Sequence, residues 1–495
     1  MTLKSLLSST KKLFLSLSKV KVVELLVLLQ KEYAKLEVEN ATLKAELQKQ
    51  KIQEVNKIAN KPSSKQAEWE KVTPITKGKK NNSSKKKVAR EGAGNQTKKR
   101  QEDKTETASV NSCDGCGKDL KKTPALASTN EHTIEDISEP SETTEIIRVI
   151  KEKKYCNDCQ QVTVAKSERA LPGTDTGLNA TVLICYLWVS LCLPFTKIQD
   201  YLTSFFGLER STSGLSKHVI MVSGIMKEVH DEILQDVQTG ITLFADETGW
   251  RVKGKNWWLW VFGTDTSAFF TVDKSRGSDV VRRVLGEIFL GVLVVDGWSA
   301  YLSLICEKQT CMAHIFRKIK KLRDAFPQLY SIGKFYLKLR RIILDGEKLQ
   351  KQRKELGEKV YQRRLLLLHK RLEALVQWRN PNEILQEIIK KVIRQQPRIL
   401  TFVEHDGVPS NNNYAERLIR IGVLKRKVSG GSMSAEGAEA YAVLLSIYVT
   451  CKLRNIPFRK YLKESLICYI RTGKPMLLKE YEKLIFDSIL HAKAA

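Results

Sequence analysis

The stretch Gly291-Val-Leu-Val-Val295 is an unbroken apolar run that is followed directly by Asp296. A continuous run of this kind is typical of a strand that is covered on both faces. A second short apolar run, Ile241-Thr-Leu-Phe-Ala245, leads into Asp246 in the same way. We therefore predict two buried strands that each end at an aspartate, and these two strands decide the fold class.

The segments around these runs predict the rest of the sheet. Trp257-Trp-Leu-Trp-Val-Phe262 and Ala268-Phe-Phe-Thr-Val272 are rich in the aromatic and β-branched residues that strands prefer. A helix fits residues 278–288, and residues 312–400 are helical and strongly basic. Three hairpin-like strands, a helix and a further strand followed by helices indicate an α/β fold with a mixed sheet of ribonuclease-H-like type.

A third acid, Glu416, lies on a predicted helix behind the run Pro409-Ser-Asn-Asn-Asn413. Because strand ends converge at one edge of a mixed sheet, Asp246, Asp296 and Glu416 can meet there. Carboxylate oxygens are the ligands that Mg²⁺ prefers, and two such ions can activate an attacking oxygen and stabilise a leaving one. Each acid alone is better explained as a turn residue or a helix cap, but the three contexts together reverse this preference and favour a magnesium or manganese site.

Three motifs resemble those of DDE transposases of the insertion sequence 66 family. Ala245-Asp-Glu-Thr-Gly-Trp-Arg-Val252 resembles the region of the first Asp, and Val295-Asp-Gly-Trp-Ser-Ala-Tyr301 resembles the region of the second. Asn412-Asn-Tyr-Ala-Glu-Arg417, followed by residues 426–432 and 436–438, resembles the Glu region. The resemblance runs from about residue 113 to about residue 463.

This resemblance implies the roles of the three acids. Asp246, Asp296 and Glu416 would be the catalytic triad and the metal ligands of a catalytic domain over residues 240–455. A helical insertion at about 312–405 would precede the Glu. Cys311-Met-Ala-His314 resembles the CxxH element of transposases with such insertions. We favour core packing for this pair over metal binding, because two ligands do not make a zinc site.

Several basic residues near Glu416 are candidate DNA contacts. Arg417 and Arg420 share its helix, where they hold phosphate or simply pair with Glu416. Lys425, Arg426 and Lys427 stand before the turn Ser429-Gly-Gly431 and would bind phosphate, with a solvated charge run as the alternative.

Net charge gives the class of partner. A net charge of +29 and a pI near 9.6 indicate nucleic acid or an anionic membrane as the partner. The uncharged stretch from Thr176 to Thr196 is long enough to span a bilayer, but Gly177, Asn179 and Pro194 favour a buried helix. We expect no membrane contact.

Residues 170–238 would form a helical DNA-binding domain. Hydroxyls from Ser211 onward would cap a helix that begins near residue 214. We favour ordinary helix packing over a helix-turn-helix for this segment.

Two CxxC pairs predict a zinc ribbon over residues 113–165. Cys113, Cys116, Cys156 and Cys159 supply four thiolates, which is how a structural tetrahedral zinc site is built. The separation of the pairs is longer than is usual, and its acidic part, from Glu131 to Glu145, is expected to loop out. Four reduced thiols without metal are the alternative.

The first 112 residues are expected to hold a helix and a linker. Leu29, Leu36 and Leu43 form one seam of a heptad pattern in a coiled-coil helix at 1–50, and Asn40 on the other seam favours two strands and hence a homodimer. A helix packed on its own domain is the alternative. Residues 51–112 predict a disordered basic linker whose Lys85-Lys86-Lys87 cluster binds DNA phosphates or is merely solvated.

The combined interpretation is a cytoplasmic, nucleoid-associated DDE transposase with a C-terminal helical tail at 456–495. It would bind both ends of a mobile element and target DNA, with accessory proteins encoded by the element as possible partners. Metal-activated water would hydrolyse a phosphodiester, and the exposed 3′ hydroxyl would attack target DNA. The alternatives are a non-catalytic zinc-ribbon and coiled-coil regulator and a structure-specific nuclease on the same fold.

Overall fold

The computed structural model describes residues 144–156, 161–380 and 382–494, together with Glu32, Lys35, Glu39, Thr42 and Glu46, which are helical. Apart from these five positions, the expected coiled-coil helix lies outside the described residues. The basic linker with Lys85, Lys86 and Lys87 lies outside them as well, and so does the four-cysteine site, of which only the backbone of Cys156 is described.

The first described elements are a small hairpin and four helices. Strand β1 (Lys153–Cys156) pairs antiparallel with β2 (Gln161–Val164). Four helices follow, and they are α3 (Leu178–Val189), α4 (Phe195–Phe206), α5 (Thr212–Ile225) and α6 (Lys227–Gln238). The expected hydroxyl cap is present, since Ser211 Oγ accepts the Gly214 N–H at 3.1 Å, although α5 begins two residues earlier than expected.

The uncharged stretch forms a buried helix. Most residues of α3 are buried, in agreement with the prediction for residues 176–196. Within the described part of the chain, no helix is both long and apolar enough to cross a membrane.

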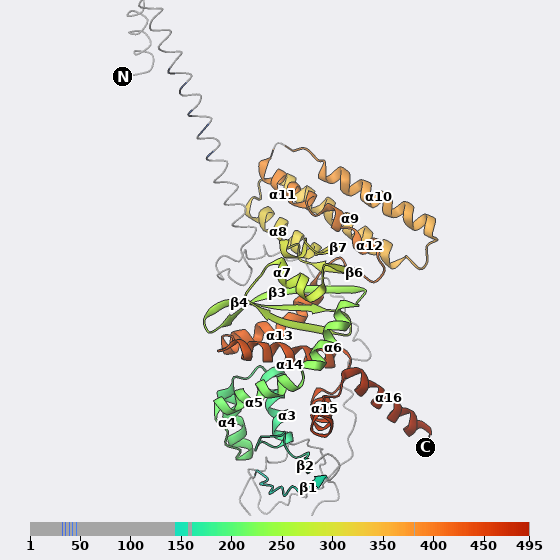
Figure 1. Cartoon of the computed structure of the whole chain (residues 1–495). Helices are drawn as coiled ribbons and strands as arrows, with labels where there is room; N and C mark the ends of the chain where they lie inside the picture. The colour runs from blue at the N-terminus through green and yellow to red at the C-terminus, as the bar shows by residue number, and fades with distance from the viewer. Residues whose placement is uncertain are drawn as a thin grey trace, which may run out of the picture.

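A five-stranded mixed sheet forms the centre of the molecule (Figure 1). Its strands are β3 (Thr242–Val252), β4 (Lys255–Gly263), β5 (Ala268–Asp273), β6 (Ile288–Val295) and β7 (Ile305–Thr310). The order across the sheet is β5-β4-β3-β6-β7. The pairs β3–β4 and β4–β5 are antiparallel, whereas β3–β6 and β6–β7 are parallel. This mixed α/β core is consistent with the ribonuclease-H-like fold that the sequence predicts.

Two predicted boundaries are wrong. Asp246 does not end its strand, because β3 continues to Val252 through antiparallel pairing with β4 as far as the Val252–Lys255 pair. The helix expected over 278–288 is α7 (Ser278–Leu285), which stops early because Gly286 adopts a positive φ of 80° at its C-cap. Strand β6 then begins at Ile288, three residues before the apolar run.

Two helices pack beneath the sheet. Figure 1 shows α13 (Asn413–Ser429) and α14 (Ala435–Leu453) beneath the strands. Glycines allow α13 to approach closely, since a Cβ at Gly422 would lie 2.3 Å from the Leu259 side chain and a Cβ at Gly263 would lie 2.4 Å from Leu418. The short distance between helix and sheet therefore requires glycine at these two positions.

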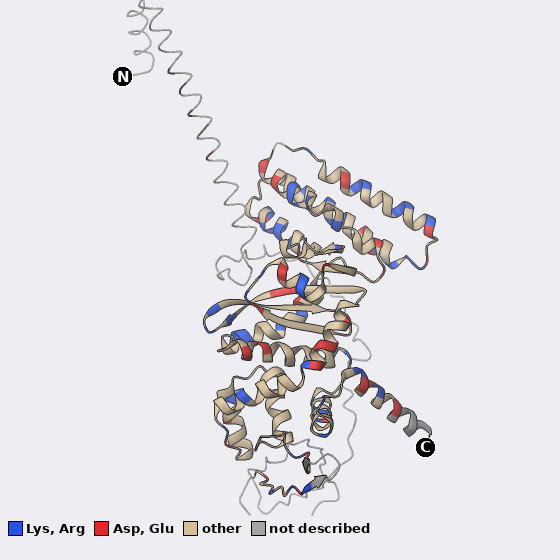
Figure 2. Ribbon diagram, viewed as in Figure 1, with Lys and Arg blue, Asp and Glu red and all other residues tan. Residues whose placement is uncertain are grey.

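The helical insertion follows β7 and forms a separate layer at the top of Figure 1. It contains α8 (Met312–Ala325), α9 (Tyr330–Lys351), α10 (Glu358–Val376), α11 (Glu383–Ile393) and α12 (Thr401–Glu404). The Gln309 side chain attaches it to β7, because its Oε1 accepts the Phe402 N–H at 2.8 Å. Lys and Arg are spread along these helices (Figure 2).

The chain ends in α15 (Phe458–Thr472) and α16 (Leu478–Ala494). The Glu232 carboxylate on α6 caps α16, because it accepts the backbone N–H groups of Leu478 at 2.8 Å and Lys479 at 3.1 Å. A carboxylate at a helix N-terminus also interacts favourably with the helix dipole.

Candidate active site

Strand register places Asp246 beside Asp296. Strands β3 and β6 run parallel, with Thr242 opposite Val292 and Phe244 opposite Val294. The same offset brings position 246 level with position 296. Strand β6 ends at Val295, so Asp296 is the first residue beyond it. The two aspartates therefore lie on adjacent segments and, because alternate residues share a face, on the same side of the sheet.

That side is the one covered by α13. The Phe244 ring lies 4.8 Å from the Tyr414 ring of α13 between centroids, so every second residue of β3, including Asp246, faces this helix. Glu416 lies in the first turn of α13. The fold thus brings the three acids predicted from the sequence to one place.

The asparagine run holds the start of α13 in position. The Asn412 side chain is buried and its Nδ2 donates to the Ala245 carbonyl at 2.8 Å, one residue before Asp246. The Asn412 backbone N–H donates to Cys311 Sγ at 3.1 Å. The Met312 N–H donates to the Ser410 carbonyl at 3.0 Å. These three bonds connect β3, the start of α8 and the start of α13 around the acids.

The electrostatics of the site show an excess of negative charge. Burial raises the pKa of Asp246 well above its ordinary value, and the negative charges of Glu247, Asp296 and Glu416 raise it further. Glu416 Oε1 is buried without a hydrogen-bond partner. Among the described residues, no Lys or Arg forms an ion pair with Asp246 or Asp296. An aspartate whose pKa is raised by neighbouring acids and an unpartnered carboxylate oxygen fit a bound cation.

The acids do not form a complete ligand set as they stand. Across the described ranges, no three His, Cys, Asp or Glu side chains are grouped so that they could hold a metal ion. Closure of the side chains around a cation would therefore be required. Because Mg²⁺ keeps several waters and takes only one or two carboxylates directly, loosely spaced acids are compatible with it.

His314 and Arg317 of α8 border Glu416. His314 Nε2 lies 3.7 Å and Arg317 Nη2 lies 3.9 Å from Glu416 Oε1. Burial lowers the pKa of His314, and its Nδ1 is buried without a hydrogen-bond partner. Cys311, by contrast, is 0% exposed. The two residues of the CxxH element thus have different surroundings, since Cys311 belongs to the core and His314 lies at the acids.

Sequence reasoning missed Glu247 on the opposite face of β3. Its side chain is 2% exposed and pairs with Arg276, with Arg276 Nη2 at 2.8 Å from Glu247 Oε1. Tyr301 donates its hydroxyl to Glu247 Oε2 at 2.5 Å. Burial raises the pKa of Glu247 despite these partners. Glu247 and Tyr301 fall inside the motifs that carry the first two aspartates, and this position could have indicated a role at the site. Nothing in the sequence indicates such a role for Arg276.

Arg276 also packs against two tryptophans. Its guanidinium carbon lies 4.4 Å from the centroid of the Trp258 ring and 4.0 Å from that of Trp298. The Trp298 backbone N–H donates to Asp296 Oδ1 at 2.8 Å, and the Trp298 indole donates to the Arg276 carbonyl at 3.4 Å. Glu247, Arg276 and Trp298 therefore connect the two strands that carry the aspartates.

The predicted DNA contacts on α13 differ in exposure. Arg417 and Arg420 are both exposed, and the Arg417 guanidinium carbon lies 5.6 Å from the centroid of the Tyr414 ring. Neither arginine forms an ion pair with Glu416. Arg426 is half-buried beside Gly249, and Lys427 is exposed.

Lys425 does not face solvent. It is 3% exposed, and its ammonium donates to the Leu193 carbonyl at 2.8 Å and lies 5.1 Å from the Trp188 ring centroid. Burial lowers its pKa to about 8. In this position the ammonium holds α13 against α3 and the segment that follows it, so we leave Lys425 out of the proposed DNA contacts.

The glycine turn after this basic run contacts the protein itself. The Ser432 N–H donates to the Arg251 carbonyl at 2.8 Å, and the Lys253 N–H donates to the Ser432 carbonyl at 2.9 Å. A Cβ at Gly431, whose φ is 129°, would lie 2.3 Å from the Arg251 carbonyl oxygen. The glycine is therefore required for the close approach of this turn to β3.

Comparisons with known proteins identify a family. A family model described as "Transposase IS66 family" matches residues 175–440, which is more than half of the 495 residues. The chain is similar to the Sinorhizobium fredii protein named "Uncharacterized protein y4qI", with 24% identity over 59% of this chain and 60% of the relative. It is also similar to "Uncharacterized protein y4jD" of the same organism, with 24% identity over 62% of this chain and 66% of the relative. The chain spans less than two thirds of the length of these relatives.

The Glu247 pair yields a prediction about stability. Changing Glu247 to Ala leaves the Arg276 guanidinium and the Tyr301 hydroxyl without their carboxylate. We expect the free energy of unfolding to fall by about 2 kcal/mol, since Arg276 is partly exposed and recovers some hydration. Chemical denaturation of the full chain measures this. Glu287→Ala, at an exposed residue of the same sheet region, is the matched control, and an equal loss in both variants would contradict the assignment.

Proposed function

Because this chain belongs to the insertion sequence 66 family of transposases, we propose that it cuts DNA at the ends of a mobile element and joins the 3′ ends to target DNA. The family implies DNA binding and polynucleotidyl transferase activity. The observation that carries the proposal for this chain is that Asp246, Asp296 and Glu416 lie on the α13 side of the sheet, near enough that the charges of Asp296 and Glu416 raise the pKa of Asp246.

In this proposal Asp246, Asp296 and Glu416 are the catalytic residues and the ligands of magnesium or manganese. Divalent ions bound there would offset the charge of the phosphate and promote the attack of an oxygen on phosphorus. Much of the catalysis would come from positioning and from charge stabilisation. The chain's own contribution is to hold three carboxylates at fixed places.

Neighbouring groups support this arrangement. Asn412 holds the first turn of α13 against β3, so that Glu416 stays beside Asp246. Arg317 and His314 limit where the Glu416 carboxylate can turn. Trp298 donates its backbone N–H to Asp296 and thereby orients that carboxylate. Each of these groups acts through a carboxylate rather than on the DNA itself.

DNA would be held by basic residues around the acids. We assign phosphate contacts to exposed or half-buried cations on α13, and to the lysine cluster of the N-terminal linker. These residues are Arg417, Arg420, Arg426 and Lys427, with Lys85, Lys86 and Lys87. Phosphate contacts release counterions, so the dependence of DNA affinity on salt concentration measures how many contacts a variant has lost.

Two other functions share part of these features. A nuclease on the same fold would use the same acids and cut DNA but would not join ends. A non-catalytic regulator would bind DNA through zinc ribbon and coiled coil alone. Against the regulator stands the half-buried Glu416, whose Oε1 atom is buried without a hydrogen-bond partner at a cost in stability that binding alone does not require.

The central prediction concerns the three acids. Asp246→Asn, Asp296→Asn and Glu416→Gln should each abolish magnesium-dependent cleavage, because an amide keeps the shape and removes the charge that binds the cation. DNA affinity and its salt dependence should remain close to those of the unchanged protein. Purified full-length proteins are compared in one cleavage and joining assay with candidate element ends and pre-cut ends.

Glu307→Gln is the control, since it makes the same change at an exposed position of β7. Full cleavage by Glu416→Gln would show that another residue is the third acid. Cleavage without joining of a pre-cut end would favour the nuclease, and no metal-dependent cleavage by the unchanged protein would favour the regulator.

We also propose that Cys113, Cys116, Cys156 and Cys159 hold one structural zinc. Four cysteine thiolates in CxxC pairs are the usual donor set for such a site. Cys116→Ser should lower the bound zinc and loosen the local fold, because the metal supplies folding energy. Elemental analysis of the purified chain measures the metal, with Cys468→Ser as a control, and protein prepared without chelators that contains no zinc would refute the site.

We also propose that the chain forms a homodimer through residues 22–50. Leu29, Leu36 and Leu43 repeat at heptad spacing, and Asn40 favours a two-stranded coiled coil. Removing residues 1–50 should convert the dimer to a monomer in sedimentation experiments. If the shortened chain associates as strongly as the full chain, the dimer contact lies elsewhere.

A further inference from the structure

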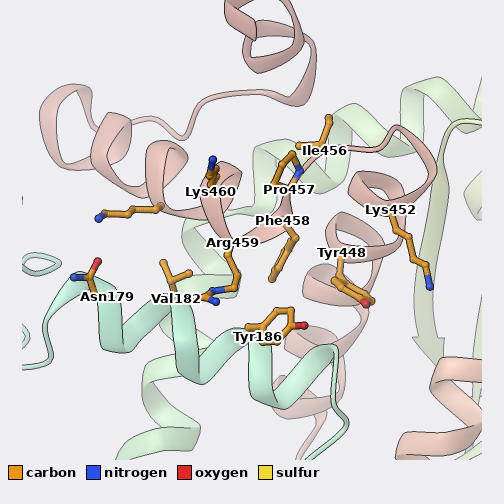
Figure 3. Close-up of a pocket in the computed structure, with 11 residues that line it drawn as sticks. Asn179, Val182, Tyr186, Tyr448, Lys452, Ile456, Pro457, Phe458, Arg459 and Lys460 are labelled. Atoms are coloured by element: carbon orange, nitrogen blue, oxygen red, sulfur yellow. The ribbon is translucent and has the colours of Figure 1, made fainter. Parts of the chain in front are cut away.

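A basic pocket lies on the far side of α14 from the sheet. It has a volume of about 720 Å³ and is lined by residues of α3, of α14 and of the start of α15 (Figure 3). None of its lining residues belongs to the group around the three acids. The same helix, α14, therefore contacts the sheet on one side and borders this pocket on the other.

The pocket carries four cations and no acid. Lys452, Arg459, Lys460 and Lys463 line it, and its remaining lining residues are uncharged. Among the described residues, none of the four forms an ion pair. Four like charges around one cavity repel one another, which costs stability unless an anion occupies the cavity.

Two of these cations stand where a helix disfavours them. Arg459 and Lys460 lie in the first turn of α15, and that turn contains no acid and no side-chain cap. The N-terminus of a helix carries partial positive charge, so basic residues there are unfavourable and a bound anion is favourable. The position of these two residues adds to the repulsion within the pocket and points to the same class of ligand.

The floor of the pocket consists of aromatic side chains that contact one another and neighbouring residues. Tyr448 and Phe458 pack edge to face at 5.4 Å between centroids, and the Tyr448 hydroxyl accepts a hydrogen bond from Ser190 Oγ at 2.9 Å. The Arg459 guanidinium lies over the Tyr186 ring at 5.9 Å, as Figure 3 shows. Flat apolar rings between cations suit a polymer that alternates charged phosphates with apolar sugar faces.

We propose that this pocket binds a phosphodiester backbone of double-stranded DNA, at a place separate from the three acids. Lys452, Lys460 and Lys463 contact phosphates, and the Tyr186 and Phe458 rings contact the sugars between them. The pocket would thus hold DNA that continues away from the cleavage position. This inference rests on the proposed function, which makes DNA the partner of the chain.

The test changes the two exposed lysines of the pocket together. Lys452→Gln with Lys460→Gln should reduce the slope of log affinity against log salt by about 2 for a linear duplex, since each lost phosphate contact contributes about 0.9 to this slope. The full-length protein is used, and thermal unfolding confirms that the variant is folded. The double Arg variant at the same positions should restore the slope, because it keeps both charges.

A pair of exposed lysines in the insertion provides the matched control. Lys354→Gln with Lys359→Gln removes the same charge elsewhere. Equal reductions in the two pairs would show a general charge effect and overturn the pocket as a site. Acetylation footprinting gives a second readout, in which a duplex should protect Lys452, Lys460 and Lys463.

Two further outcomes overturn the inference. The first is an unchanged slope of log affinity against log salt in the pocket variant. The second is protection of these lysines from acetylation in the absence of DNA, because the acidic segment Glu131 to Glu145 or another part of the chain would then cover the pocket. The proposed function is judged separately from cleavage by the unchanged protein. A reduced slope in a protein that never cleaves would support the pocket and count against the transposase chemistry.

Discussion

The repulsion among Asp246, Asp296 and Glu416 is the constraint on which the rest of the structure depends. Three acids from segments far apart in the sequence share a partly buried space, and the charges of Asp296 and Glu416 both raise the pKa of Asp246. Bringing acids together against their repulsion requires other bonds that hold the backbone around them. Those bonds are present, because Asn412 connects α13 to β3 and the Glu247–Arg276 pair stabilises the opposite face.

Close packing between α13 and the sheet is the second requirement. Gly263 and Gly422 allow helix and strand to approach, and Gly431 brings the end of the helix against the β3 backbone. Lys425 adds a buried ammonium that donates to the carbonyl oxygens of Trp188 in α3 and of Leu193 in the connection after it. Glu416 therefore sits on a helix that is held at its start, its middle and its end.

Much of this arrangement could be predicted from the sequence. Apolar runs revealed the central strands, the asparagine run marked the beginning of α13, and the convergence of strand ends at one edge of a mixed sheet implied that the acids can meet. The end of β3 could not be predicted, since its continuation to Val252 depends on pairing with β4 rather than on its own polar residues. The burial of Lys425 was hidden as well, because its partners are backbone carbonyls more than 200 positions away in the chain.

Arg276 illustrates a different limit of sequence reasoning. A lone arginine in a loop carries no pattern, and its meaning arises only from Glu247, Trp258 and Trp298, which tertiary structure brings around it. Residues that position an active site through other residues lack the spacing rules that mark ligands. They become visible only when the contacts are known.

The way the helical insertion leaves and rejoins the core has a consequence for how such chains can vary. The Met312 N–H at its start donates to the Ser410 carbonyl at its end, so the insertion is a loop whose two ends are tied together at the edge of the sheet. The entropy of closing a loop changes only slowly with its length. The segment can therefore gain or lose whole helices while Cys311 and Asn412 keep their bond, and chains with insertions of very different size can retain the same spacing between the second aspartate and the glutamate in space.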